Sequence, residues 1–239
     1  MRTLFGYEEE PNFPPRYNVA AAQPIGIVRQ VDGKRHFVLV RWGLLPSWIK
    51  DPRTFSLLIN ARGETVLEKP AFRAAMKRRR CLIPADGFYE WQEDGGRKRS
   101  FFIHAKSGAP LAFAGLWETW TGPYGEELET AAIVTTRANQ MLAPIHDRMP
   151  VIVPPEAFDL WLDCANVDAQ TVAALITPAL EDLLEAYEVS TAVNRTTNDG
   201  PKLREPVVAG QLQPEAVKPP TRRARAKRVK NDDGQGALF

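Results

Sequence analysis

The sequence is poor in the residues that build disulfide frameworks and metal centres. Its 239 residues include only two cysteines and three histidines. Two cysteines form no disulfide framework and suit a reducing compartment, and three histidines scattered along the chain are too few for a zinc site. We therefore expect no metal and no other cofactor.

Long apolar runs are also missing. No stretch approaches the length that crosses a bilayer, and the first residues lack the apolar core of a secretion signal. The sequence thus predicts a cytoplasmic protein without a membrane partner, associated with the nucleoid if it binds DNA. Apolar residues still make up 44% of the chain, which is ordinary for a globular protein with a substantial core.

The small net charge of +2 hides an uneven distribution. Residues 218–239 carry seven cations and two anions, so this segment has a charge of +5 and the remaining body −3. If the protein binds nucleic acid, a body of this charge must do so through a local groove, and the tail adds an attraction for phosphate that does not depend on sequence. We expect one domain over residues 1–208, followed by a disordered basic tail over residues 209–239.

What the sequence does contain is a succession of short strands. Alternating or β-branched apolar residues predict strands at 25–28, 36–43, 81–83, 88–91, 100–104, 112–120, 129–136 and 189–193. Asp32-Gly33 is typical of a hairpin turn. Helices are expected at 66–77, 155–164 and 168–179, with a further short helix at 181–188. This pattern predicts an α+β fold built on a curved antiparallel sheet or open barrel with peripheral short helices.

The most informative stretch is residues 81–91, CLIPADGFYEW, which predicts a strand, a turn and a second strand. Glu90 lies between Tyr89 and Trp91, on the opposite face if strand alternation holds. A carboxylate among aromatic rings loses solvation, so its pKa should rise into the range where it can exchange protons. The alternative is a glutamate exposed at the end of a strand.

Six motifs, in this order and spacing, resemble the SRAP family (SOS response-associated peptidases, also called abasic-site processing proteins). The motifs are RYNVA at 16–20, WGL at 42–44, PSW at 46–48, NARGET at 60–65, the 81–91 stretch and HDRMP at 146–150. The resemblance covers residues 11–207. It implies a DNA-damage protein of the SOS response that binds single-stranded DNA at abasic sites and acts as a monomer.

The resemblance also implies hydrolase, protease and lyase-like chemistry. A family member removes its initiator methionine, and the exposed N-terminal cysteine forms a thiazolidine crosslink with the abasic aldehyde. By the same resemblance Asn60 orients the N-terminal amine, Glu90 carries protons, and His146 stabilises the Schiff-base intermediate. The alternatives are an Asn60 that caps a turn and a His146 that lies on the surface.

The DNA-binding residues implied by the resemblance belong to four different segments. Arg62 and Arg148 are expected to contact phosphates, because a guanidinium group suits phosphate, and Thr135 is a further phosphate contact. Trp48 and Trp42 are expected to line the groove for the strand, where stacking tolerates any base. The alternative for Trp48 is a loop tryptophan folded onto the core.

The start of the sequence departs from the family pattern, because residue 2 is Arg and no Met-Cys-Gly-Arg segment is present. Cys81 and Cys164 lie inside a predicted strand and helix and are expected to be packing residues. Two explanations stay open: the chain begins at an internal methionine, which the uncapped helix near Met1 favours, or it is a non-catalytic single-stranded DNA-binding paralogue. Whether this chain is an enzyme is therefore open. A peptidase acting on other proteins is a third reading, disfavoured because no Ser-His or Cys-His pair is apparent.

The last five residues, QGALF, resemble the peptide with which bacterial replication factors dock on the sliding clamp. An apolar Leu238-Phe239 pair at the tip of a polar tail has no core to join, so a partner pocket is a reasonable destination. Gln235 completes the pattern. The alternative is a chance ending.

Overall fold

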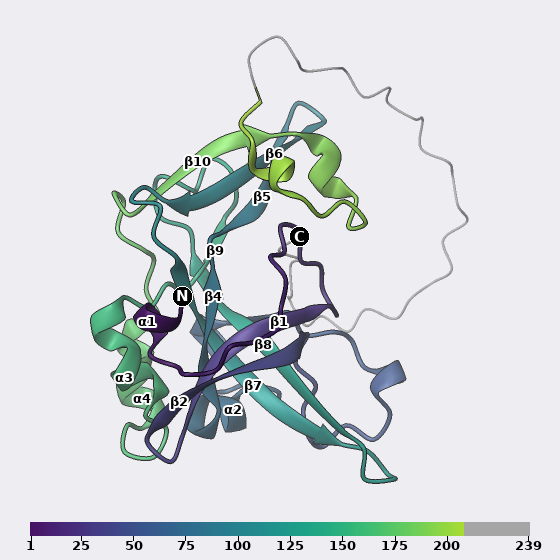
Figure 1. Ribbon diagram of the computed structural model, residues 1–239, viewed down its shortest axis with the longest axis vertical. Helices are drawn as coiled ribbons and strands as arrows, with labels where there is room; N and C mark the ends of the chain where they lie inside the picture. The colour runs from purple at the N-terminus through teal and green to yellow at the C-terminus, as the bar shows by residue number, and fades with distance from the viewer. Residues whose placement is uncertain (208–239) are drawn as a thin grey trace.

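The computed structural model describes residues 1–207 (Figure 1). The predicted tail, with Gln235, Leu238 and Phe239, lies outside the described residues. No helix in the described part of the chain is long and apolar enough to cross a membrane.

The larger of two sheets contains seven strands, in the order β2-β1-β4-β7-β8-β3 with β9 paired to β8. Its strands are β1 (Pro24–Val31), β2 (Lys34–Trp42), β3 (Asn60–Arg62), β4 (Arg80–Ala85), β7 (Leu111–Thr121), β8 (Glu127–Arg137) and β9 (Arg148–Pro150). An additional pairing between β2 and β8 closes β2, β1, β4, β7 and β8 into a five-stranded barrel. The predicted α+β open barrel is thereby confirmed.

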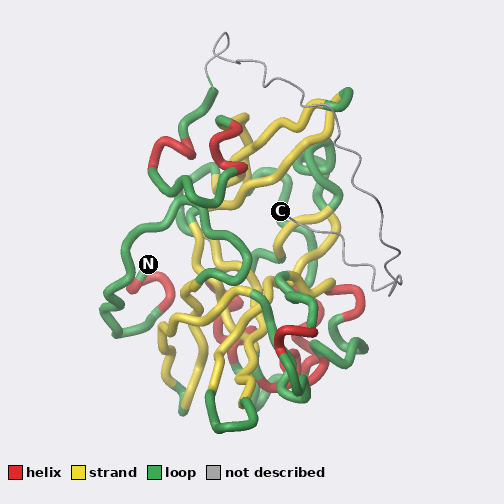
Figure 2. The backbone as a smooth tube through the Cα atoms, turned by 90° about the vertical axis from the view of Figure 1, so that its right-hand side faces the viewer, coloured by secondary structure: helices red, strands yellow, loops and turns green. Residues whose placement is uncertain are grey.

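The smaller sheet has the order β10-β6-β5 and lies at the upper end of the molecule in Figure 1. Its strands are β5 (Gly87–Asp94), β6 (Arg97–Ala105) and β10 (Leu184–Val189). The helices are short: α1 (Arg2–Phe5), α2 (Arg73–Arg78), α3 (Phe158–Leu162) and α4 (Ala169–Val172), with 3₁₀ turns at Pro52–Thr54, Gly63–Thr65, Pro155–Ala157, Ala173–Leu175, Thr191–Asn194 and Pro201–Arg204. Figure 2 shows the helices at the periphery of the strands.

The hairpin between β1 and β2 turns at the predicted Asp32-Gly33 pair. Val31 pairs with Lys34, so the loop has two residues. Their φ angles of 49° and 77° are both positive, and such turns match the right-handed twist of the adjoining strands. Asp tolerates this conformation and Gly adopts it without steric cost.

Two pairings of the main sheet are parallel, contrary to the expected antiparallel sheet. β2 pairs with β8 through Arg41–Thr130 and Trp42–Ala131, and β3 pairs with β8 over its three residues. Both pairings join segments far apart in the sequence, and parallel neighbours require long connections. The remaining pairings are antiparallel.

Apolar side chains form two large clusters on opposite sides of the main sheet strands. One cluster combines sheet residues such as Leu82 and Val134 with helix residues such as Met76 and Trp161. The other combines main-sheet residues such as Ile27 and Ile133 with Ile103 and other residues of the smaller sheet. The second cluster therefore joins the two sheets and fixes β5 relative to β8.

Several predicted elements were wrong in type or extent. The helix expected at 168–179 is the short α4, followed by a 3₁₀ turn that ends at Leu175. The expected helix at 181–188 is β10, which pairs with β6 from Leu184 to Val189, so tertiary pairing overrides the helix propensity of its glutamates. As a result, the strand expected at 189–193 ends at Val189. The helix expected at 66–77 begins only at Arg73, because Pro70 prevents a continuous helix through the middle of that segment.

Candidate functional site

Strand register gathers several of the predicted site residues at one edge of the main sheet. Asn60 pairs with Ile133, and Arg62 pairs with Thr135. Thr135 in turn pairs with Pro150 of β9, two residues after Arg148. Because paired residues share a face and side chains alternate along a strand, Asn60, Arg62 and Thr135 lie on the same face of this edge.

The amide side chain of Asn60 is buried without a partner. Neither its Oδ1 nor its Nδ2 makes a hydrogen bond with any described residue, although both atoms are shielded from solvent. A buried amide left unpaired costs roughly 1–3 kcal/mol. A turn cap would require a hydrogen bond from this side chain to the backbone, and Asn60 makes none with the described residues.

The carboxyl group of Glu90 is buried, with 1% of the residue exposed, which excludes the reading as an exposed strand-end glutamate. It shares the face of Phe88, opposite Tyr89 and Trp91, as the alternation predicted. Burial raises the pKa of Glu90 to about 8, and the negative charge of Asp147 adds to this rise. The Trp91 N–H and the charge of Lys98 oppose it. Its Oε1 has no hydrogen-bond partner among the described residues.

His146 lies in the loop that leads from β8 into β9. Its Nδ1 accepts a hydrogen bond from the Arg148 N–H at 3.0 Å and also lies 3.3 Å from the Arg148 carbonyl oxygen. The ring is 22% exposed, and Nδ1 is 3.4 Å from a carboxylate oxygen of Asp147. Asp147 also contributes to the raised pKa of Glu90. The loop that carries Asp147 therefore lies close enough to β5 for the charges of Asp147 and Glu90 to interact.

The side chain of Arg148 is held by protein partners. Its Nη1 and Nη2 donate to the two carboxylate oxygens of Glu64 at 2.6 and 2.9 Å. Nη2 also donates to the carbonyl and the hydroxyl oxygen of Thr135 at 2.8 and 3.1 Å. Thr135 itself is 1% exposed. The structure therefore brings these two predicted phosphate contacts together, and their contact with DNA stays a prediction.

The two predicted groove tryptophans have different environments. Trp42 is buried at the end of β2, and its indole N–H donates to the Ile59 carbonyl at 3.0 Å. Trp48 is 59% exposed and makes an edge contact with Phe55, with ring centroids 6.0 Å apart. Trp48 is thus not folded onto the core, whereas the buried Trp42 lines part of the groove described next.

A groove of about 1100 Å³ separates the 11–21 loop from the strands, and its lining comes from both sheets. Aromatic rings and prolines dominate its walls, with Trp42 and Ile133 on the main sheet and Phe88 and Trp91 on β5. A second hollow of about 440 Å³ is lined by Arg62, Arg137, Ala138, Ala143, Asp147 and Arg148. Arg137 was missed from the sequence, because a single arginine after a strand carries no distinguishing signal.

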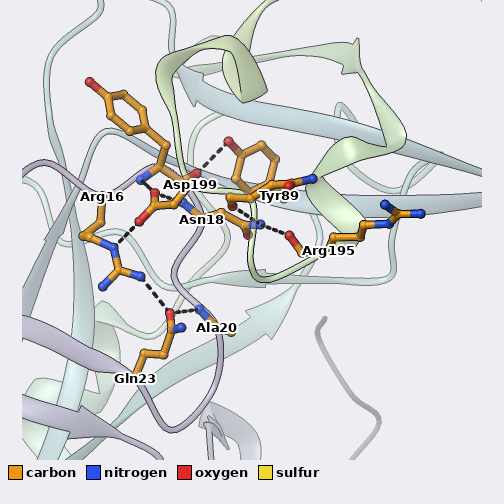
Figure 3. Close-up of polar contacts among 9 residues, drawn as sticks. Arg16, Asn18, Ala20, Gln23, Tyr89, Arg195 and Asp199 are labelled. Carbon is orange, nitrogen blue, oxygen red and sulfur yellow. Dashed lines mark hydrogen bonds and ion pairs between the residues drawn. The ribbon is translucent and has the colours of Figure 1, made fainter.

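One wall of the groove is fastened by polar contacts between residues 16–18 and 193–199, which we call the clasp (Figure 3). The Asp199 carboxylate accepts from the Arg16 side chain and from the backbone N–H groups of residues 17 and 18 at 2.6 and 3.2 Å. The Asn18 side chain donates to the carbonyls of Val193, Arg195 and Asn198.

The clasp extends to the loop that follows it and to β5. Gln23 Oε1 accepts from Arg16 and from the Ala20 N–H, and the Tyr89 hydroxyl donates to the carbonyl of residue 17 at 2.8 Å (Figure 3). Since Tyr89 adjoins Glu90, the clasp connects the RYN motif to the strand that carries the buried carboxyl. The sequence analysis identified the motif at residues 16–20, but nothing in the sequence indicated that Asp199 is its partner.

The two cysteines of the described chain are free, and their surroundings differ. Cys81 is fully buried on β4, and burial raises the pKa of its thiol far above the ordinary range; Cys164 is also free. Within residues 1–207 no group of three or more His, Cys, Asp or Glu side chains is arranged to hold a metal ion.

Comparison with known proteins finds a match along most of the chain. Residues 1–196 match the family described as SOS response associated peptidase (SRAP). The abasic site processing protein YoqW of Bacillus subtilis is 43% identical over 197 residues, covering 82% of this chain and 88% of the relative. The abasic site processing protein YedK of Escherichia coli is 35% identical over 206 residues, covering 84% and 88%.

Solved structures show the same fold. A crystal structure of a Bacteroides thetaiotaomicron protein matches with a TM-score of 0.69 and 28% identity, covering 81% of this chain and 82% of that chain. A Bordetella bronchiseptica protein matches with a TM-score of 0.70 and 26% identity, covering 80% and 94%.

Proposed function

Because this chain belongs to the SRAP family, we propose that it processes abasic sites in DNA and binds them in single-stranded form. The observation that carries the proposal is the pair of buried, unpartnered polar groups on Asn60 and Glu90. A fold gains nothing from either group, whereas an N-terminal amine and the aldehyde of an abasic sugar would engage both. Arg62 lies on β3 with Asn60, and His146 lies in the loop between β8 and β9.

In the proposed chemistry the reactive nucleophile is an N-terminal α-amine, which has a pKa near 8. The amine attacks the aldehyde carbon of the ring-opened abasic sugar, and loss of water leaves a Schiff base. A neighbouring thiol then adds to the carbon of that Schiff base, and its proton passes to the nitrogen, which gives a thiazolidine. No oxidant or reductant is required.

The three candidate catalytic residues would divide this work by their surroundings. The Asn60 amide can accept from the amine and orient it. Glu90, whose pKa is raised to about 8, can release and take up a proton near neutral pH, as ring opening and loss of water require. The ring of His146 can donate a hydrogen bond to the sugar hydroxyl or to the departing oxygen.

The crosslinking step depends on the residue that carries the α-amine. In this sequence residue 2 is Arg, and Cys81 and Cys164 have nitrogens tied up in peptide bonds. In the proposed chemistry this chain would supply the binding and proton-transfer groups, and the crosslink would require an N-terminal cysteine. A non-catalytic single-stranded DNA-binding module is the second candidate, because the exposed Trp48 suits base stacking without any chemistry.

Intact mass spectrometry separates the two candidates. The protein is purified from its native source, and its mass is measured before and after incubation with abasic single-stranded DNA. A chain that begins with cysteine and gains the mass of the DNA strand less one water supports the crosslinking reading. A mass equal to that of the 239-residue chain, with retained DNA binding and no adduct, supports the binding module. Absence of binding to abasic or intact single strands contradicts both.

The C-terminal QGALF segment is proposed as a docking peptide for the sliding clamp. Tethering to the clamp would raise the local concentration of the domain at stalled replication forks. A pull-down with the purified clamp tests this: deletion of Leu238 and Phe239 should abolish capture, and unchanged capture would rule the peptide out. The matched control is Asp232-Asp233→Asn-Asn, in the same tail.

A further inference from the structure

Three arginines converge on the edge of the main sheet where β3, β8 and β9 meet. Arg62, Arg137 and Arg148 all line the hollow of about 440 Å³ described above. Two of them, Arg62 and Arg148, belong to sequence motifs. Arg137, the last residue of β8, belongs to none, and its presence in this hollow calls for a physical explanation.

The register places Arg137 where a cation is unfavourable for folding. It pairs directly with Arg148 across β8 and β9, and like charges in directly opposed positions of an antiparallel pair are destabilising. Two residues earlier on the same face, Thr135 pairs with Arg62. Arg137 therefore has Arg148 directly opposite it on β9, and it lies roughly 7 Å along β8 from the level of Arg62 on β3.

The nearby carboxylates form a direct ion pair with only one of the three cations. Both oxygens of Glu64 are occupied by the bidentate pair with Arg148. This contact is the main cause that holds the pKa of Glu64 below its usual range, and the charge of Arg137 adds to it from a distance. Asp147 also lines the hollow, but its side chain is 87% exposed and faces Nδ1 of His146 at 3.4 Å. Among the described residues, neither Arg62 nor Arg137 has an ion-pair partner within 4 Å, and both are exposed.

We propose that Arg137 is a phosphate-binding residue, which together with Arg62 holds the DNA backbone next to the reactive groups, whereas Arg148 is held by Glu64 and Thr135. The inference rests on the proposed binding of single-stranded DNA and adds a contact to it. A guanidinium that forms no ion pair within 4 Å, in an open hollow beside a second one, matches the fork geometry with which arginine binds phosphate. Bound phosphate would also relieve the repulsion between Arg137 and Arg148.

Salt dependence of binding tests the contact. The dissociation constant of the full chain for an abasic single-stranded oligonucleotide is measured from 50 to 300 mM KCl. Each phosphate contact that is lost lowers the slope of log K against log salt by about 0.7 for a single strand. We expect Arg137→Gln to lower the slope by this amount and to weaken binding several-fold at the lowest salt, whereas Arg137→Lys keeps the slope.

The control is Arg73→Gln, an exposed arginine on α2, which should leave both slope and affinity unchanged. Thermal unfolding of Arg137→Gln should occur at the wild-type temperature or above it, since the substitution removes a like-charge neighbour of Arg148. If the wild type binds DNA and Arg137→Gln has the wild-type slope, the Arg137 contact is wrong and the proposed function stands. If Arg73→Gln lowers the slope equally, the effect is one of net charge and the contact is likewise wrong. If the wild type binds no single-stranded DNA, the proposed function fails and the contact fails with it.

Discussion

Asn60 and Glu90 both lower the stability of the fold. Apolar residues of similar size at these two positions would not. Each carries a side-chain atom that is buried without a hydrogen-bond partner among the described residues. Natural chains retain such groups at sites where a ligand or a proton completes them. At the scale of single residues, we therefore expect substitutions of Asn60 and Glu90 to change the free energy of unfolding measurably.

For Glu90 the loss depends on pH. Its pKa rises from 4.5 to about 8 on folding, so between these values the folded state holds a proton that the unfolded state has released. The stabilising contribution is fully present below pH 4.5 and is lost as the pH rises through 8. We expect Glu90→Gln to be more stable than wild type at pH 9 by on the order of 3 kcal/mol, and to differ little near pH 4.5.

Urea unfolding at several pH values measures this difference. Glu93→Gln, an exposed position on the same strand, is the matched control and should leave the pH profile of wild type unchanged. A parallel pH dependence for wild type and Glu90→Gln would mean that Glu90 is ionised in the folded protein at neutral pH, and its proposed proton transfer would lose its basis.

For Asn60 the expected result is a trade of function for stability. Asn60→Leu replaces an unpaired buried amide by an apolar group of similar size, which should stabilise the fold by about 1 kcal/mol. The same change should remove abasic-site processing, because nothing would orient the amine. Thermal unfolding and a binding assay on one preparation measure both effects, and a lowered unfolding temperature would show that the amide has a structural partner.

At the scale of elements, the clasp connects the N-terminal loop to the segment after β10. Residues 11–21 have little regular structure of their own, and the contacts of Asp199 and Asn18 hold them against the rest of the molecule. Ala22, which follows this loop, has a positive φ of 69°, a conformation that costs an L-residue roughly 1 kcal/mol. The hydrogen bonds of Asp199 and Asn18 offset this cost by holding the loop in place.

We expect Asp199→Ala to release this loop. The substitution removes an ion pair with Arg16 and two bonds from backbone N–H groups, and should cost about 2 kcal/mol. Hydrogen exchange should become faster in residues 11–23 while β7 and β8 stay protected. Asp86→Ala, which removes one bond to Arg204 at 3.2 Å, is the control, and equal exchange in both variants would mean that the clasp holds nothing.

At the scale of the whole molecule, Arg80 joins the barrel to its helices. It begins β4 and is 1% exposed, and burial lowers the pKa of its guanidinium. The side chain donates to the carbonyls of Met76, Trp161, Asp163 and Val167 at 2.6–3.0 Å. One side chain thus satisfies the ends of α2 and α3 and the loop before α4.

Loss of this side chain should destabilise the entire fold. We expect Arg80→Met to cost roughly 3 kcal/mol, because the carbonyls would be left buried without donors. Guanidinium unfolding compares it with Arg78→Met, an exposed neighbour on α2 that should be close to neutral. A cost below 1 kcal/mol for Arg80→Met would show that these carbonyls find other donors.

The sequence predicted what is encoded locally. Alternation around Glu90 predicted its face and its burial, and Asp32-Gly33 predicted the hairpin turn. The pairing of β3 with β8, the partner of the RYN motif at Asp199 and the position of Arg137 depend on segments that meet only in the folded chain, so no local pattern carries them. β10 was predicted as a helix because its strand conformation depends on pairing with β6, which no local pattern of residues 181–188 shows.

The parallel contact between β2 and β8 has a consequence for synthesis of the protein. β2 ends at Trp42, and its barrel partner is Ala131, so the ribosome must make the intervening chain before the barrel can close. At roughly 5–20 residues per second this delay is on the order of ten seconds, during which the β1–β2 hairpin presents an unpaired strand edge. A polypeptide released before residue 131 would lack the joined β3–β8 edge altogether, and with it the arrangement of Asn60, Arg62 and Thr135 on one face.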